Sequence, residues 1–132
     1  MLGDLTTLEG VKKNFDSEIY PGAVLISTTA WLQNNPTIAR HLAKAVQRSL
    51  HWCHQHTARE IADKMPSAFR LQDRAIYEEA VAHTVAILSP DGLMPIEAVE
   101  AEKRMLSLAN KTGHLAALDV TQTFTNEFVS AR

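Results

Sequence analysis

Apolar and small side chains recur at intervals of three and four along residues 38–53, and this spacing predicts one continuous face of an α-helix. Asn35 and Pro36 stand just before this pattern. They suit the N-cap and the first helical position, because Asn can accept from free backbone N–H groups and Pro needs no donor there. We therefore expect a long helix from Pro36, whose apolar-to-small face comprises Ile38, Leu42, Ala45, Val46, Ser49 and Cys53.

Local capping chemistry delimits two further helices. Thr57 followed by Glu60 fits a capping box, in which each side chain satisfies a backbone N–H at the helix start, and Pro66 ends this helix. Asp73 is the expected N-cap of a third helix. The turn formers Ser-Pro-Asp-Gly at residues 89–92 end it.

The C-terminal third predicts a fourth helix that begins at Pro95 and that Gly113 stops as a left-handed C-cap. A last short helix should follow, because two aromatic residues are spaced four apart beyond a capping residue. The fourth helix is expected to turn Ile96, Val99, Met105, Leu106 and Ala109 inward, and the last to carry Phe124 and Phe128 behind a cap at Asp119 or Thr121.

Residues 23–29 (Ala-Val-Leu-Ile-Ser-Thr-Thr) are rich in β-branched side chains and are the only convincing strand. A lone strand cannot satisfy its own backbone groups, so it needs partner strands. The chain offers no second segment of similar quality. A short helix is also expected over residues 8–15, weakened by Gly10. The predicted fold is mostly α with one or few β-strands.

Composition narrows the class of protein. The chain has 132 residues, 45% hydrophobic and 21% charged, with a net charge of -2, which is ordinary for one globular domain and does not favour nucleic acid. Its single cysteine, Cys53, permits no internal disulfide. We expect no membrane-spanning helix, and, because the N-terminus lacks a secretory signal, a cytoplasmic chain if it is expressed as written.

Histidines gather at residues 51–56 (His-Trp-Cys-His-Gln-His), where a metal site is the first idea to weigh. On a helix, His51 and His54 share one face while Cys53 and His56 share another, so the four side chains do not converge as zinc requires. A helix end that favours histidines near the negative pole of the dipole is the preferred interpretation. Cys53 is expected in the core rather than as a nucleophile. We predict no metal and no cofactor.

Neither catalysis nor DNA binding has a convincing motif. The chain has no Gly-x-Ser-x-Gly, Gly-x-Gly-x-x-Gly or Gly-Lys-Ser/Thr loop, and its glutamates follow helical spacing typical of solvated faces. Residues 57–88 imitate a helix-turn-helix, but the second helix offers Arg74 followed by Glu78 and Glu79, and these carboxylates would repel phosphate. We expect no enzyme and no nucleic-acid partner.

Several segments, in order, carry a resemblance to a known family. They are residues 4–10, residues 20–32 with Tyr-Pro-Gly-Ala-Val-Leu and Thr-Thr-Ala-Trp-Leu, residues 35–52, residues 60–66, and two closing signatures at residues 89–95 (Ser-Pro-Asp-Gly-Leu-Met-Pro) and 123–128 (Thr-Phe-Thr-Asn-Glu-Phe). Together they resemble the C-terminal part of the solute-binding proteins that serve ABC importers of the nitrate, sulfonate, taurine and thiamine-precursor type, with the periplasmic-binding-protein type II fold.

The resemblance implies an α/β receptor of two lobes that close on a small solute, anionic or containing nitrogen or sulfur, and then dock on a membrane permease. In that frame residues 1–22 form a crossover segment, residues 23–132 the C-terminal part of the first lobe, and the whole chain one partial domain in the periplasm. The signal peptide, most first-lobe strands and nearly all of the second lobe would be missing. The candidate ligand-binding residues are those nearest the crossover: Asp4, Thr6, Thr7 and Tyr20.

Two expectations follow. A lone strand at residues 23–29 leaves an open edge, so the chain should self-associate through this edge or through uncovered helix faces. The alternative to the receptor is a small helical interaction or regulatory domain, with a histidine-based enzyme the least favoured option.

Overall fold

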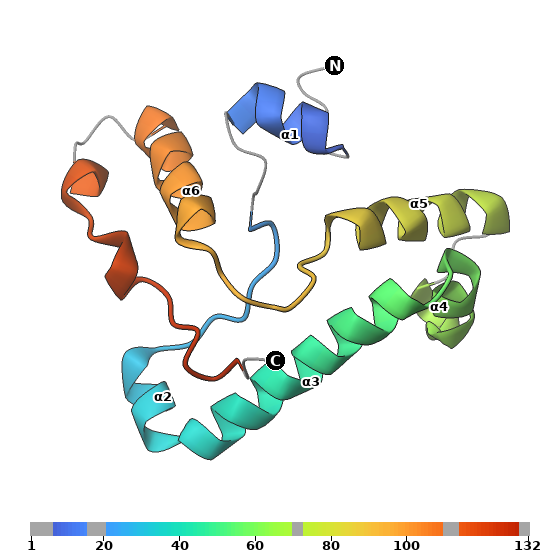
Figure 1. Cartoon of the computed structure of the whole chain (residues 1–132), viewed down its shortest axis with the longest axis horizontal. Helices are drawn as coiled ribbons and strands as arrows, with labels where there is room; N and C mark the ends of the chain where they lie inside the picture. The colour runs from blue at the N-terminus through green and yellow to red at the C-terminus, as the bar shows by residue number, and fades with distance from the viewer. Residues whose placement is uncertain (1–6, 16–20, 70–72, 110–113, 130–132) are drawn as a thin grey trace. The chain divides into compact units, whose positions relative to one another are not determined.

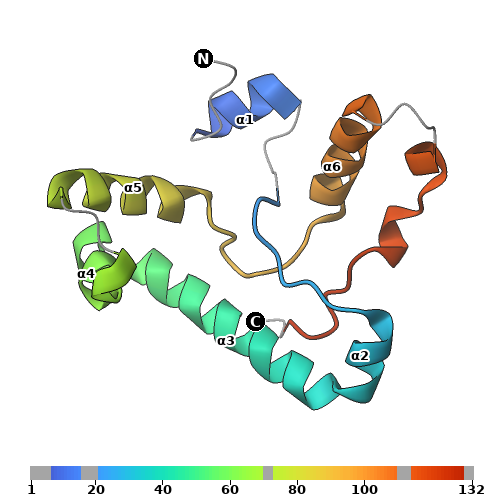
Figure 2. The same ribbon diagram turned by 180° about the vertical axis from the view of Figure 1, so that it is seen from behind.

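The computed structural model describes residues 7–15, 21–69, 73–109 and 114–129. Within these ranges the chain is mostly helical and has no strand, as Figure 1 and Figure 2 show from opposite sides. It divides into two compact units, which are described in turn: Met1–Lys44 with Leu93–Arg132, and Ala45–Gly92. The mostly α class is therefore confirmed, while the single partial domain stays a prediction.

Among the described residues, the buried side chains of the first unit are alanines and valines. α6 packs against the short η2 and η3 helices, and it buries Ala98 and Ala101 while Val120 is buried on η3. The predicted inward face of α6 is wrong at Ile96 and Leu106, which are exposed. Alanines one turn apart allow the neighbouring backbone to approach closely, which longer side chains would prevent. The unit comprises α1 (Leu8–Phe15), α2 (Thr29–Asn34), the first turns of α3 (Pro36–Gln55), α6 (Ile96–Ala109), η2 (His114–Ala117) and η3 (Val120–Gln122).

The second unit holds the rest of α3, then α4 (Ala58–Lys64), η1 (Ser67–Phe69) and α5 (Arg74–Ile87). α4 packs against α5, with Ile61 and Ala62 buried. Both predicted caps are confirmed, since Thr57 and Glu60 form a capping box and the Asp73 carboxylate accepts from the N–H groups of Ala75 and Ile76. Local polar chemistry therefore sets where these helices begin.

The strand expected at residues 23–29 is absent, and that prediction was wrong. Residues 21–28 have no regular secondary structure, and Thr29 already begins α2. A strand persists only beside another strand, and the described residues contain none. Thr28 instead caps α2, because its hydroxyl accepts from the N–H of Trp31 at 3.2 Å.

Of the remaining helix predictions, some are confirmed and others are wrong. α3 begins at Pro36 as expected, although the Asn35 amide donates to the carbonyl of Trp31 in α2 at 3.0 Å instead of capping α3. Asp119 is confirmed as a cap, but the helix behind it is the three-residue η3, which ends before Phe124. Gly113 lies outside the described residues.

Candidate functional site

The four residues proposed for ligand binding are not brought together in the part of the chain that the structure describes. Asp4, Thr6 and Tyr20 lie outside the described residues. Thr7 is exposed at the start of α1, where its hydroxyl accepts from the N–H of Gly10 at 3.0 Å. Its carbonyl accepts the first helical bond, from Val11, at 2.9 Å. The observed role of Thr7 is therefore to begin a helix.

The histidines near the end of α3 each bond to a different neighbour. His51 Nε2 lies 2.8 Å from the side-chain nitrogen of Gln55, one turn along the helix. His54 Nε2 lies 3.2 Å from the carbonyl oxygen of Ser89, which follows α5. Among the described residues, no three His, Cys, Asp or Glu side chains come close enough to hold a metal ion.

His56 packs at the C-terminal end of α3. Its ring stacks on Trp52 with the ring centroids 4.1 Å apart, and its Nδ1 lies 2.8 Å from the Trp52 carbonyl. That carbonyl is one of those that the last turn of a helix leaves without a helical partner. Cys53, on the same turn, is half-buried. The pair of His56 and Trp52 thus helps to complete a helix end.

The turn that ends α5 is held against α3 within the second unit. Gln47 donates to the carbonyl of Asp91 at 3.1 Å, and the N–H of Gly92 donates to the hydroxyl of Ser89 at 2.9 Å. Gly92 has φ +77°, a left-handed conformation, and a Cβ there would lie 3.4 Å from Leu50. The turn therefore requires glycine for its backbone conformation more than for space.

The two closing signatures meet in the first unit. Asn126, in the second signature, bonds to both backbone groups of Met94, in the first, across 32 positions of sequence. In the same unit, Lys103 of α6 donates to the carbonyl of Leu118 at 2.6 Å. Sequence reasoning missed the Asn126–Met94 contact, because no local spacing rule links positions so far apart. These motifs stabilise the fold where they meet.

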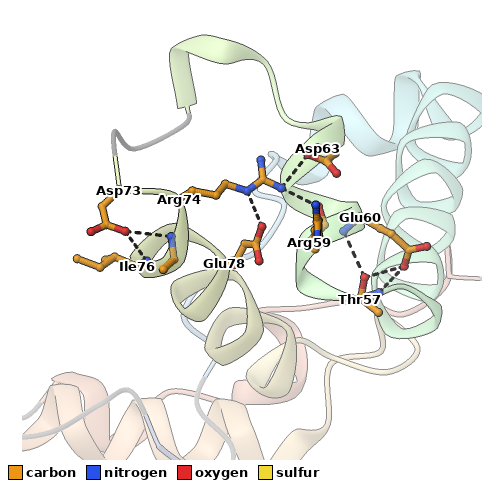
Figure 3. Close-up of polar contacts among 9 residues, drawn as sticks. Thr57, Arg59, Glu60, Asp63, Asp73, Arg74, Ile76 and Glu78 are labelled. Carbon is orange, nitrogen blue, oxygen red and sulfur yellow. Dashed lines mark hydrogen bonds and ion pairs between the residues drawn. The ribbon is translucent and has the colours of Figure 1, made fainter.

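A polar cluster on α4 and α5 centres on Arg74 (Figure 3). One guanidinium nitrogen donates to the Asp63 carboxylate at 2.7 Å and to the carbonyl of Arg59 at 3.3 Å, while Nε donates to Glu78. The hydrogen bond to Glu78, followed by that to Asp63, raises the pKa of Arg74. The one basic residue at the start of the helix that would read DNA is therefore engaged by carboxylates.

Two further carboxylates are held in their charged form by caps. Glu60 accepts from the backbone N–H and the hydroxyl of Thr57, both at 2.8 Å, and these bonds lower its pKa (Figure 3). Asp119 accepts from the hydroxyl of Thr121 at 2.6 Å and from its backbone N–H, and these bonds lower the pKa of Asp119. Both groups are exposed, and both serve helix starts.

The apolar face predicted for α3 exists, but most of it is uncovered. Ile38, Leu42 and Val46 are 50%, 49% and 40% exposed, and the helix buries only Ala39. The opposite face is polar and basic, and α3 contains no acidic residue. An amphipathic helix ordinarily buries its apolar face, so this surface is suited to packing against another element.

The segment before α2 is a second uncovered apolar surface. Val24, Leu25 and Ile26 are 48%, 65% and 89% exposed. Contiguous exposed apolar side chains of this kind mark interaction sites more often than isolated ones do. Many of the described polar side chains serve caps, turns and ion pairs.

Comparisons with known proteins add no relative. No family model matches the chain, and neither a curated protein nor a solved structure does. Within the described residues, none of the helices combines the length and the apolar character needed to cross a bilayer.

Proposed function

We propose that this chain is the C-terminal part of the first lobe of a solute-binding protein that serves an ABC importer. Residues 1–22 would form the crossover and residues 23–132 the helical end of an α/β lobe of the periplasmic-binding-protein type. The role of the receptor is to capture a small solute, anionic or containing nitrogen or sulfur, in the periplasm and to deliver it to a permease. The chain would be no enzyme, and would need no cofactor.

One observation carries the proposal: the surfaces left uncovered are those that a missing sheet would cover. Helices in α/β folds lay an apolar face on a sheet. The stripe of Ile38, Leu42 and Val46 is such a face, and it is about half exposed. Residues 24–26 have the composition of a strand and have no strand beside them among the described residues. An exposed apolar helix face and an unpaired segment of strand composition are both expected when the sheet that would cover them is not part of the chain.

The order of helices adds support. A long helix from Pro36, a short helix capped by Thr57, a turn at residues 89–92 and a helix after Pro95 occupy the segments that carry the resemblance. The contact of Asn126 with Met94 gives the two closing signatures a shared structural purpose. The candidate ligand residues Asp4, Thr6, Thr7 and Tyr20 remain part of the proposal at the crossover.

The alternative function is a small helical interaction or regulatory domain. The exposed stripe of α3 favours it equally, since such a face suits a protein partner. A helix-turn-helix that reads DNA is the weaker form of this alternative. Arg74 is bonded to Asp63 and Glu78, so it would have to leave two carboxylates to reach a phosphate.

The test is a thermal melt of the chain followed by the fluorescence of Trp31 and Trp52. Nitrate, taurine, alkanesulfonates and pyrimidines would each be added, with sodium chloride at equal ionic strength as the control. A ligand that binds only the folded state raises the melting midpoint. A reproducible rise with one solute, absent with chloride, supports ligand capture and identifies the solute class. A cooperative melt that none of them moves counts against ligand capture by this chain.

A further inference from the structure

Residues 24–28 form a short, uncharged segment without regular secondary structure. Among the described residues, no hydrogen bond engages the backbone of Val24, Leu25 or Ile26. The chain has no charged residue from Pro21 to Ala39. Pro21 limits the segment on one side, because it lacks an N–H, and α2 limits it on the other. What remains is about the length of an ordinary strand.

Two copies of this segment can pair with each other without opposing charges. In an antiparallel pair centred on Ile26, Val24 lies opposite Thr28 of the second copy and Leu25 lies opposite its Ser27. Alternation places Val24, Ile26 and Thr28 on one face of the ribbon, and all three are β-branched. Such side chains pack well across strands, and no like charges would be opposed.

We propose that a second copy of this chain pairs with residues 24–28 in antiparallel register, with each Ile26 opposite its counterpart. A second copy is the favoured occupant because it brings the same exposed, uncharged segment, and a two-fold axis lets both edges bond at once. Ile26, the most exposed of the large hydrophobic residues in the described structure, then becomes the centre of the interface. A ribbon of two short strands is marginal, so the association depends on concentration.

This pairing concerns the chain by itself, since in the proposed receptor residues 24–26 would instead lie beside the receptor's own sheet. It requires neither a solute nor any chain other than this one, so it can succeed where ligand capture fails, and the reverse. It also differs from association through the α3 stripe, which is the competing surface on the same molecule.

The first experiment measures sedimentation velocity of the full chain over a range of concentrations. Ile26→Lys places two positive charges in direct opposition, so the dissociation constant should rise about tenfold or more, since buried apolar contact is replaced by repulsion. Leu42→Lys, a matched change on the α3 stripe, should leave it unchanged. A wild-type chain that stays monomeric throughout overturns the proposal, as does association that Leu42→Lys abolishes and Ile26→Lys spares.

The second experiment maps the register by disulfide formation in a Cys53→Ser background. Directly opposed residues have Cα atoms about 4.5–5.5 Å apart, within the span of a disulfide. Ile26→Cys should therefore form a covalent dimer on mild oxidation. Leu25→Cys alone should form little, whereas Leu25→Cys mixed with Ser27→Cys should form a mixed dimer. Efficient self-linkage of Leu25→Cys would indicate parallel pairing or an antiparallel pair centred on Leu25, and either would overturn the proposed register. Far-UV circular dichroism of each variant checks that the helices are kept.

Discussion

Asn126 holds both backbone groups of Met94, accepting from its N–H at 2.9 Å and donating to its carbonyl at 3.0 Å. This reciprocal pair is the same arrangement that an edge strand would provide, supplied here by one side-chain amide. Both residues are half-buried, so water replaces the lost bonds only in part. The pair fixes the chain that enters α6 to the chain that follows η3.

Asn126→Ala should lower the free energy of unfolding by about 1 to 3 kcal/mol, because two half-buried backbone groups lose their partner. Urea unfolding in a Trp52→Phe background measures this, since Trp31 lies in the same unit as Asn126. Glu127→Ala, at an exposed neighbouring position, serves as the control and should change little. Equal stability of the Asn126 and Glu127 variants would show that the reciprocal pair contributes nothing.

Gly92→Ala should destabilise the second unit by about 1 to 2 kcal/mol, the usual strain of a left-handed backbone at a residue with a Cβ. Its φ is +77°, while the added Cβ would lie at an ordinary 3.4 Å from Leu50. Urea unfolding reported by Trp52 in a Trp31→Phe background measures the loss. Gly92→Asn, which adopts this conformation more readily, should lose less. Rescue of Gly92→Ala by Leu50→Ala would instead assign the effect to crowding.

The capping box should be visible in the pH dependence of stability. Thr57→Ala should cost about 1 kcal/mol at neutral pH, as loss of a Thr cap commonly does. Glu60 has a pKa below its ordinary value of 4.5 in the folded chain, chiefly through the backbone hydrogen bond from Thr57. Its carboxylate therefore contributes stability above the unfolded pKa, and this contribution is lost as pH falls through the folded pKa.

The measurement is the difference in melting midpoint between the wild type and Glu60→Ala across a pH series. That difference should be largest near neutral pH and should shrink in acid. Glu79→Ala, at an exposed glutamate on α5, should show a smaller difference at every pH. A gap between wild type and Glu60→Ala that stays constant down to strong acid would contradict the assigned role of the carboxylate.

Arg74 should stabilise the contact of α4 with α5 in a manner that salt weakens. Its guanidinium bonds to Asp63 and Glu78, and the Arg74 side chain is 41% exposed, so the ion pairs are screened by solvent ions. Arg74→Gln should lower the melting midpoint in dilute buffer. The gap should narrow in about 1 M salt, where the screening length falls to about 3 Å. A gap that salt does not alter would assign the effect to packing of the Arg74 stem.

The parts of the fold that the sequence predicts correctly are those that neighbouring residues decide. Asp73 and the Thr57–Glu60 pair begin helices through bonds that span two or three positions. α3 begins at Pro36, and α6 begins at Ile96, directly after Pro95. Such signals need nothing from the rest of the chain, so one sequence suffices to find them.

The missed parts depend on distant partners. Residues 23–29 have strand composition, but a strand exists only in a sheet, and the described residues supply no neighbour. The Asn126–Met94 pair and the Arg74–Asp63 ion pair join residues 32 and 11 positions apart. The predicted inward face of α6 is wrong because the helix buries Ala98 and Ala101, whereas the larger Ile96 and Leu106 are exposed. For the candidate site, only Thr7 lies among the described residues, and its hydroxyl bonds to Gly10.

The small side chains at the centre of each unit determine how the chain responds to temperature. Ala62 and Ala98 are completely buried, and no large side chain in the described residues is. Burying alanines removes little apolar surface from water, and exposed apolar surface is what raises the heat capacity on unfolding. Calorimetry should therefore give a heat-capacity increment below the roughly 12 cal/mol/K per residue of ordinary domains. The free energy of unfolding would then vary almost linearly with temperature, and cooling would weaken this chain less than it weakens proteins with aromatic or leucine-rich interiors.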